Sequence, residues 1–217
     1  MIDLQLIWDS LPNLLYGTVI SLQITAIAAF IGLFLGIIFG FAETAPSRIV
    51  RIAIGAYVTL FRGTPMLVQI LFVFYVLPEF GMTIAPFWAA SIAIGLNSSA
   101  YISQIIRAAI NAVPKGQVEA ARTLGFTPIK TIRYIIFPQA VRFALPALGN
   151  ELITLVKDSS LASIIGVMEL SKEGSIIRSR TYDAFSILLA VSFIYLTLTA
   201  SLGFILKKFE TRASVHA

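Results

Sequence analysis

Three long stretches of the chain contain no Asp, Glu, Lys or Arg, and this feature restricts the fold more than any other. They cover residues 10–42, 80–106 and 184–206. Each is longer than the roughly 20 apolar residues that a helix needs to cross a bilayer. Only 12% of the 217 residues are charged, which is about half the roughly 25% found in ordinary soluble domains. We therefore expect an integral membrane protein built from transmembrane helices.

Two further stretches are apolar and long enough to cross a membrane, although they carry one and three charged residues. The sequence therefore predicts an all-α fold with five transmembrane helices in a single domain over residues 1–217. The N-terminal segment lacks the basic region and cleavage site of a secretory signal, so we expect it to belong to the mature protein. The predicted spans are about 12–42, 57–78, 86–107, 137–157 and 184–206.

The basic residues indicate how the chain is oriented. The segments after the first, third and fifth spans carry two, five and three Lys or Arg residues, whereas the segments on the opposite side carry three in total. Basic loops remain on the cytoplasmic side. We therefore expect a bacterial cytoplasmic membrane protein, in contact with lipid, with its N-terminus outside and its C-terminus in the cytoplasm. This distribution explains the net charge of +5 without a nucleic-acid partner.

Small residues recur at every fourth position of the first span, at Ala28, Gly32, Gly36 and Gly40. Small residues on one helical face allow a neighbouring helix to approach the backbone closely. We expect this face to be a helix-packing surface.

The longest predicted cytoplasmic loop, residues 107–133, is the most polar part of the chain. Its residues 115–125 are expected to form a helix, with Pro114 near the start and Gly125 as a left-handed cap at the end. We expect this helix to lie at the inner face of the membrane, accessible to a partner.

The same loop carries a motif whose spacing resembles the signature of ABC importer permeases. The signature reads Glu-Ala-Ala, three residues, Gly, nine residues, then Ile-x-Leu-Pro. Phe137 replaces its Leu. The segments FRGTP at 61–65 and NELITLVKDSSL at 150–161 resemble the polar amino acid branch of that family, so the likeness covers most of the chain. The matching residues are Glu119, Ala120, Ala121, Gly125, Ile135 and Pro138.

The resemblance implies the fold of a type I importer permease and a set of partners. In this family the motif helix is a coupling helix that docks on an ATP-binding cassette subunit. It implies two ATPase subunits, a second permease chain, here expected to form a homodimer, and an extracytoplasmic solute-binding protein. Because the chain has no G-x-x-x-x-G-K-[ST] phosphate loop, ATP and Mg²⁺ are expected on the partner ATPase. We expect no cofactor, metal site or catalytic residue in this chain, which has no cysteine and a single histidine, His216.

Polar residues inside the spans are the candidates for substrate contact, because burying them in a membrane is costly. At about 1.5 Å per residue, Gln69, Asn97 and Glu151 fall about 14, 17 and 10 Å below the outer ends of their spans. Asn97, Tyr101 and Gln104 share one helical face, and Glu151, Leu155 and Asp158 share another. The candidate substrate-binding residues are Glu151, Asn97, Ser98, Gln69, Thr64, Pro65, Leu155 and Asp158.

We expect Glu151 to pair with a cationic group of the cargo, which favours a basic amino acid. Asn97, Ser98 and Gln69 are expected to supply hydrogen bonds, while Thr64 and Pro65 shape a bend in the second span. The alternatives are that Glu151 pairs with Arg142 or Lys157, and that Asn97 makes a packing hydrogen bond. Arg62 we interpret as an inner-side anchor rather than a ligand.

Three other classes of protein remain as alternatives. An ATPase-independent channel for small polar solutes leaves the polar loop unexplained. Secondary transporters commonly contain paired repeats and interrupted helices, and we find neither pattern in the sequence. A membrane enzyme is disfavoured because the spans and inner loops hold no metal-ligand set and no nucleophile with a base. The apolar stretch 159–168 is too short to span and is expected to be a re-entrant or lid element or a docking surface.

Overall fold

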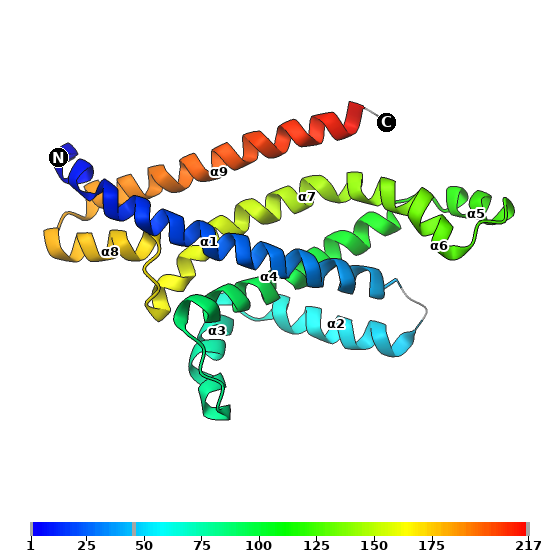
Figure 1. Cartoon of the computed structure of the whole chain (residues 1–217), viewed down its shortest axis with the longest axis horizontal. Coiled ribbons are helices and arrows are strands. Elements are labelled where there is room, and N and C mark those ends of the chain that lie inside the picture. The colour runs from blue at the N-terminus through cyan, green and yellow to red at the C-terminus, as the bar shows by residue number, and fades with distance from the viewer. Residues whose placement is uncertain (1, 45–46, 216–217) are drawn as a thin grey trace.

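The computed structural model describes residues 2–44 and 47–215, with the side chains of residues 209–215 excepted. His216 lies outside the described residues. Every regular element of the described chain is helical, and together the helices form an elongated body (Figure 1). The α-helices are α1 (Leu4–Ala42), α2 (Arg48–Gly63), α3 (Met66–Leu71), α4 (Pro86–Asn111), α5 (Lys115–Thr123), α6 (Pro128–Thr131), α7 (Phe137–Asp158), α8 (Leu170–Thr181) and α9 (Ala184–Val215).

Four short helical segments of other types complete the fold. Two are π-helical and two are 3₁₀-helical: η1 (Phe72–Val76), η2 (Leu77–Phe80), η3 (Ile132–Ile136) and η4 (Ser159–Ile165). The first turn of α8 lies beside the N-terminal part of α1, while α5 and α6 lie at the opposite end of the body (Figure 1).

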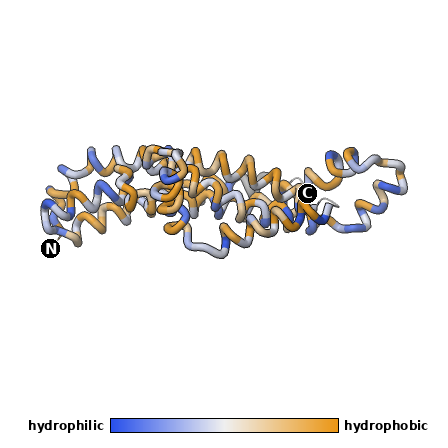
Figure 2. Tube along the Cα trace, turned by 90° about the horizontal axis from the view of Figure 1, so that it is seen from below, coloured by the Kyte–Doolittle hydropathy of each residue, from blue (hydrophilic) through white to orange (hydrophobic). Residues whose placement is uncertain are grey.

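The described helices include three that are long and apolar enough to cross a membrane, Leu4–Ala42, Pro86–Asn111 and Ala184–Lys208. A fourth is the bent pair Arg48–Gly63 and Met66–Phe80. The remaining predicted span, 137–157, lies in α7, which has 22 residues and is less apolar because of its charged residues. The count of five spans therefore stays a prediction. Figure 2 shows hydrophobic residues over the middle of the body, with hydrophilic residues frequent towards both ends.

The predicted span at 57–78 is two helices rather than one. The second helix is bent by 104° from the direction of the first. Between them Thr64 has ψ 146° and Pro65 has ψ 135°, both extended. A residue before proline is driven out of the helical region by the proline ring, and proline itself has no N–H to donate. The break therefore follows from the sequence at the position where a bend was expected.

The predicted small-residue face of α1 packs on α4. A Cβ atom added at Gly36 would lie 2.6 Å from Cβ of Ile102, and one added at Gly40 would lie 2.6 Å from Cβ of Ile106. Ala28 is fully buried in the same contact. The close approach predicted from the four-residue spacing is confirmed, and it makes α1 and α4 the central pair of the fold.

The segment after α7 is packed into the body. Ala162 and Ile165 of η4 are buried with residues of α1, α3 and α4 in one apolar cluster. Beyond η4, the side chain of Glu169 is fully buried, caps α8 and accepts hydrogen bonds from Ser21 of α1 and Tyr195 of α9. The 159–168 stretch is therefore held against the helices on several sides.

We predict that Gly36→Ala destabilises the protein, since the added methyl group collides with Ile102. Overpacking of this kind costs about 1–3 kcal/mol. The matched control is Gly55→Ala on α2, where an added Cβ meets nothing within 4 Å. It is expected to be neutral or to stabilise by up to about 1 kcal/mol. Thermal unfolding of the purified protein in detergent measures both, and equal shifts in the two variants would contradict the packing account.

Candidate functional site

The break between α2 and α3 leaves a backbone carbonyl without its helical partner, and two amide side chains replace that partner. In a continuous helix the carbonyl of Phe61 would accept from the N–H of residue 65, which is proline. Instead it accepts from Nε2 of Gln69 at 2.8 Å and from Nδ2 of Asn97 at 3.0 Å. Nδ2 of Asn97 also donates to Oε1 of Gln69 at 2.9 Å. The two amides thus fix the bend against α4.

Glu151 of α7 is held from the neighbouring helix α4. The hydroxyl of Ser98 donates to Oε1 of Glu151 at 2.7 Å, and Ser98 is fully buried where α4 meets Gly32 of α1. Within the described part of the chain, neither Arg142 nor Lys157 forms an ion pair with Glu151. The carboxylate is half-buried and has an oxygen left for another ligand.

Two cavities meet at these residues. The bend cavity has a volume of about 620 Å³ and lies at the α2–α3 break. The α4–α7 cavity has a volume of about 480 Å³ and follows α4 towards the end that leads into α5. Both volumes fall within the roughly 300–1,000 Å³ of small-molecule sites. Arg62, Tyr101 and Glu151 line both cavities.

The lining residues show which predicted positions face these spaces. The bend cavity has a polar wall, whereas the α4–α7 cavity is bordered mainly by small and apolar side chains. The bend cavity is lined by Arg62, Gly63, Thr64, Pro65, Met66, Asn97, Tyr101, Glu151, Thr154 and Asp158. The α4–α7 cavity is lined by Arg62, Tyr101, Gln104, Ile105, Ala108, Ala109, Ala112, Phe143, Ala147 and Glu151.

Five of the eight residues predicted from sequence therefore line the bend cavity: Thr64, Pro65, Asn97, Glu151 and Asp158. Ser98 and Gln69 lie behind the wall and hold Glu151 and Asn97 in place. Leu155 is fully buried in the apolar core, and Thr154 lines the cavity instead. The residues of α7 that face the bend cavity are thus Glu151, Thr154 and Asp158, at positions i, i+3 and i+7.

Arg62, which we interpreted from the sequence as an inner-side anchor, lines both cavities in the structure. We expected an anchor at the inner membrane surface, yet its guanidinium lies over the ring of Tyr101, 5.0 Å from the centroid, on the wall of both cavities. A charged residue within a predicted span is costly and usually faces a cavity or a partner, and this rule could have indicated the position of Arg62 from the sequence.

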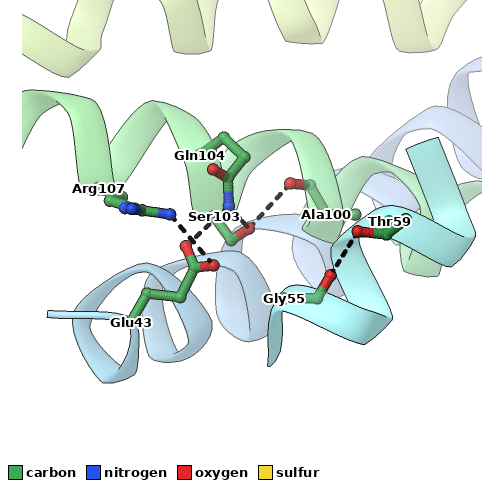
Figure 3. Close-up of polar contacts among 7 residues, drawn as sticks. All are labelled: Glu43, Gly55, Thr59, Ala100, Ser103, Gln104 and Arg107. Carbon is green, nitrogen blue, oxygen red and sulfur yellow. Dashed lines mark hydrogen bonds and ion pairs between the residues drawn. The ribbon is translucent and has the colours of Figure 1, made fainter. Parts of the chain in front are cut away.

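A separate polar cluster joins the ends of α1 and α4 (Figure 3). Glu43 accepts from Nε2 of Gln104 at 2.7 Å and lies 3.6 Å from the guanidinium of Arg107. The Glu43 side chain is 4% exposed and that of Arg107 49%. Because α4 ends at Asn111 and α5 begins at Lys115, this cluster fixes the end of α4 just before α5.

The helix expected at 115–125 is α5, which has Glu119 and Ala120 exposed and Ala121 buried. Gly125 follows it with φ +77°, the left-handed conformation predicted for that position. The N–H of Phe126 donates to the carbonyl of Ala121 at 3.0 Å, closing the turn. Pro138 stands in the first turn of α7, and Gln139 donates to Gln117 of the α5 helix at 2.6 Å. The loop is thus tied firmly to α7.

Comparison with known families decides the class of protein. Residues 10–215 match the binding-protein-dependent transport system inner membrane component family. The chain belongs to this family. It is an inner-membrane, multi-pass permease subunit of an amino acid ABC importer, a transporter component and not an enzyme. Membership implies an ATPase and a substrate-binding protein as partners.

Its relatives include permeases with different named cargo. The glutamine transport system permease protein GlnP of Escherichia coli (strain K12) is 39% identical over 215 residues, 98% of each chain. The arginine transport system permease protein ArtQ of Bacillus subtilis (strain 168) is 39% identical over 203 residues, 93% of each. The L-cystine transport system permease protein TcyB of the same strain is 41% identical over 192 residues, 88% of this chain and 81% of the relative.

Solved structures confirm the predicted type I importer permease fold. A crystal structure of an amino acid ABC transporter with histidines gives a TM-score of 0.92 at 38% identity and covers 98% of this chain and 99% of the other. An inward-facing structure of the MetNI methionine ABC transporter gives a TM-score of 0.82 at 22% identity, with 98% of this chain and 99% of that one covered. At that identity the second likeness shows the fold alone.

Proposed function

We propose that this permease imports polar amino acids through the bend cavity and prefers basic ones. The observation that carries the proposal is the charge on the cavity wall, where two carboxylates, Glu151 and Asp158, stand with one guanidinium, Arg62. A wall with excess negative charge favours cargo with net positive charge. Permeases that it resembles are named for the transport of glutamine, arginine and cystine, which supports polar amino acids as the class of cargo.

The cargo's path follows from the arrangement of the two cavities. Arg62, Tyr101 and Glu151 are shared, so an amino acid that leaves the bend cavity passes these side chains into the α4–α7 cavity. That second cavity extends to Ala112, close to the start of α5. Its mostly apolar wall offers few ligands to a polar amino acid, which favours release.

The bend cavity is incomplete in one chain. Thr64 and Pro65 are exposed, although they lie at the bend of a membrane-crossing pair of helices. A second permease copy, related by a two-fold axis, would cover them and close the path. We propose a homodimer of this chain with two ATPase subunits, to which an extracytoplasmic binding protein delivers the amino acid.

The proposed coupling element is α5, and the proposed orientation places it in the cytoplasm. The N-terminus of α1 and the α5–α6 end lie at opposite ends of the body (Figure 1). The basic residues of the 107–133 loop support a cytoplasmic position for α5, and hence an external N-terminus. The exposed face of α5, with Glu119 and Ala120, would enter a cleft of the ATPase that binds ATP and Mg²⁺.

Binding by the permease–ATPase complex in nanodiscs tests the cargo proposal. Basic amino acids are expected to bind most tightly and acidic ones most weakly. Glu151→Gln is expected to weaken binding of a basic amino acid roughly 10-fold or more, because a hydrogen bond to a charged group contributes about 1.5–3 kcal/mol. The matched control is Glu79→Gln, an exposed position away from both cavities. Tighter binding of acidic amino acids, or equal effects of the two variants, would overturn the assignment.

ATP hydrolysis by the same complex tests the role of α5. We predict that Glu119→Lys reduces complex assembly or amino-acid-stimulated hydrolysis at least tenfold, because it places a charge of the wrong sign in the proposed contact. Binding of the amino acid to the permease chain itself is expected to persist. Glu79→Lys is the charge-reversal control. Unchanged assembly and stimulation in Glu119→Lys would contradict docking through this helix.

A further inference from the structure

We propose that Arg62 binds the α-carboxylate of the transported amino acid, so that the bend cavity selects cargo with a free carboxylate. This inference rests on the function proposed above and adds the residue that recognises the negative end of the cargo. Glu151 and Asp158 then remain for the positive groups.

Arg62 lies close to the end of α2, far from where that helix begins. It is the residue before the last in α2, which begins at Arg48. Fourteen residues at about 1.5 Å each place Arg62 roughly 21 Å from that beginning. It therefore stands at the break, close to Thr64 and Pro65 of the bend cavity, and it lines both cavities.

Arg62 is exposed in the single chain, and among the described residues no carboxylate forms an ion pair with it. Its contact is the face of the Tyr101 ring. A guanidinium carries five N–H donors in its plane. The face of the Tyr101 ring does not accept hydrogen bonds from these donors in the way that a carboxylate does. These donors remain available, in a fork that matches a carboxylate in geometry.

The charges on the wall match those of a basic amino acid one for one. The wall offers one cation, Arg62, and two anions, Glu151 and Asp158. A basic amino acid carries one carboxylate, one α-ammonium group and one cationic side chain. With the carboxylate on Arg62, each remaining cation has an anion on the same wall. A neutral polar amino acid would leave one anion unmatched, and an acidic one would bring an anion that the wall cannot pair.

The same placement gives Tyr101 a part in recognition. The ring holds the guanidinium over the junction of the cavities before cargo arrives, and a pre-positioned ligand loses less freedom on binding. Tyr101 is thus a positioning residue for Arg62, and its ring rather than its hydroxyl is what this role requires.

The test is equilibrium binding to the permease–ATPase complex in nanodiscs without any binding protein, so that only the permease selects. The probes are L-arginine and agmatine, which is L-arginine without its carboxylate. We expect the wild-type complex to bind L-arginine roughly 10- to 100-fold more tightly than agmatine. In Arg62→Met this difference should fall to less than about threefold, through weaker binding of L-arginine alone, and Arg62→Lys should recover part of it.

Several outcomes separate this inference from the proposed function. If Arg62→Met weakens both probes equally, or weakens neither, Arg62 does not read the carboxylate and the inference is overturned while the cargo class stands. If the wild type binds L-glutamine more tightly than L-arginine, the basic preference is wrong, and L-glutamine with 4-aminobutanamide then tests Arg62 in the same way. Binding of no polar amino acid by the wild type would overturn both proposals.

Two further variants check that the effect is specific. Tyr101→Phe keeps the ring and is expected to retain the preference for L-arginine over agmatine, whereas Tyr101→Leu is expected to reduce it. An equal loss in both Tyr101 variants would contradict the positioning role of the ring. Thermal unfolding of each variant complex, measured without amino acid, identifies any loss that arises from misfolding.

Discussion

The proposed pathway depends on one backbone carbonyl. Because residue 65 is proline, the carbonyl of Phe61 has no helical N–H from which to accept a hydrogen bond. In an apolar environment an unpaired carbonyl is costly. Gln69 and Asn97 satisfy it from two different helices. These bonds hold the 104° bend of the α2–α3 pair, and the cavity at the bend is lined by Arg62 and Glu151. The packing of α1 on α4 supports it, since Gly32 leaves room for the Ser98 side chain that holds Glu151.

Asn97 and Gln69, which we expected from the sequence to contact substrate, support the bend in the structure. Nε2 of Gln69 donates to the backbone and to the Thr64 hydroxyl, and Nδ2 of Asn97 donates to the backbone and to Gln69, so their first task is to hold the bend. In the function we propose, the charged groups carry recognition instead. The three charges on the wall of the bend cavity would orient an amino acid along it, and the apolar wall of the α4–α7 cavity would give it few partners as it leaves. Tight binding at the bend and weak binding beyond it suit a carrier that must release its cargo.

Much of the fold could be predicted because it depends on local patterns. The uncharged stretches located three spans, the small residues of α1 identified its packing face, and Pro65 placed the bend. Leu155 was misjudged for a physical reason. The facing positions of α7 depend on how that helix is rotated against α4, and helical periodicity allowed either Thr154 or Leu155 to face the cavity. The distance of Arg62 from the start of its helix depends on α2 beginning at Arg48, which the hydropathy of residues 57–78 does not reveal. The cluster of Glu43, Gln104 and Arg107 joins residues far apart in the sequence, and no short sequence motif indicates it.

The most direct test of the account is a cryo-electron microscopy structure of the permease–ATPase complex in nanodiscs with saturating L-arginine. The account predicts density for one amino acid in the bend cavity of each permease chain, with its carboxylate at Arg62, its ammonium group at Glu151 and its side chain towards Asp158. A cavity filled by side chains of the second copy, or an amino acid bound away from Arg62 and Glu151, would contradict it.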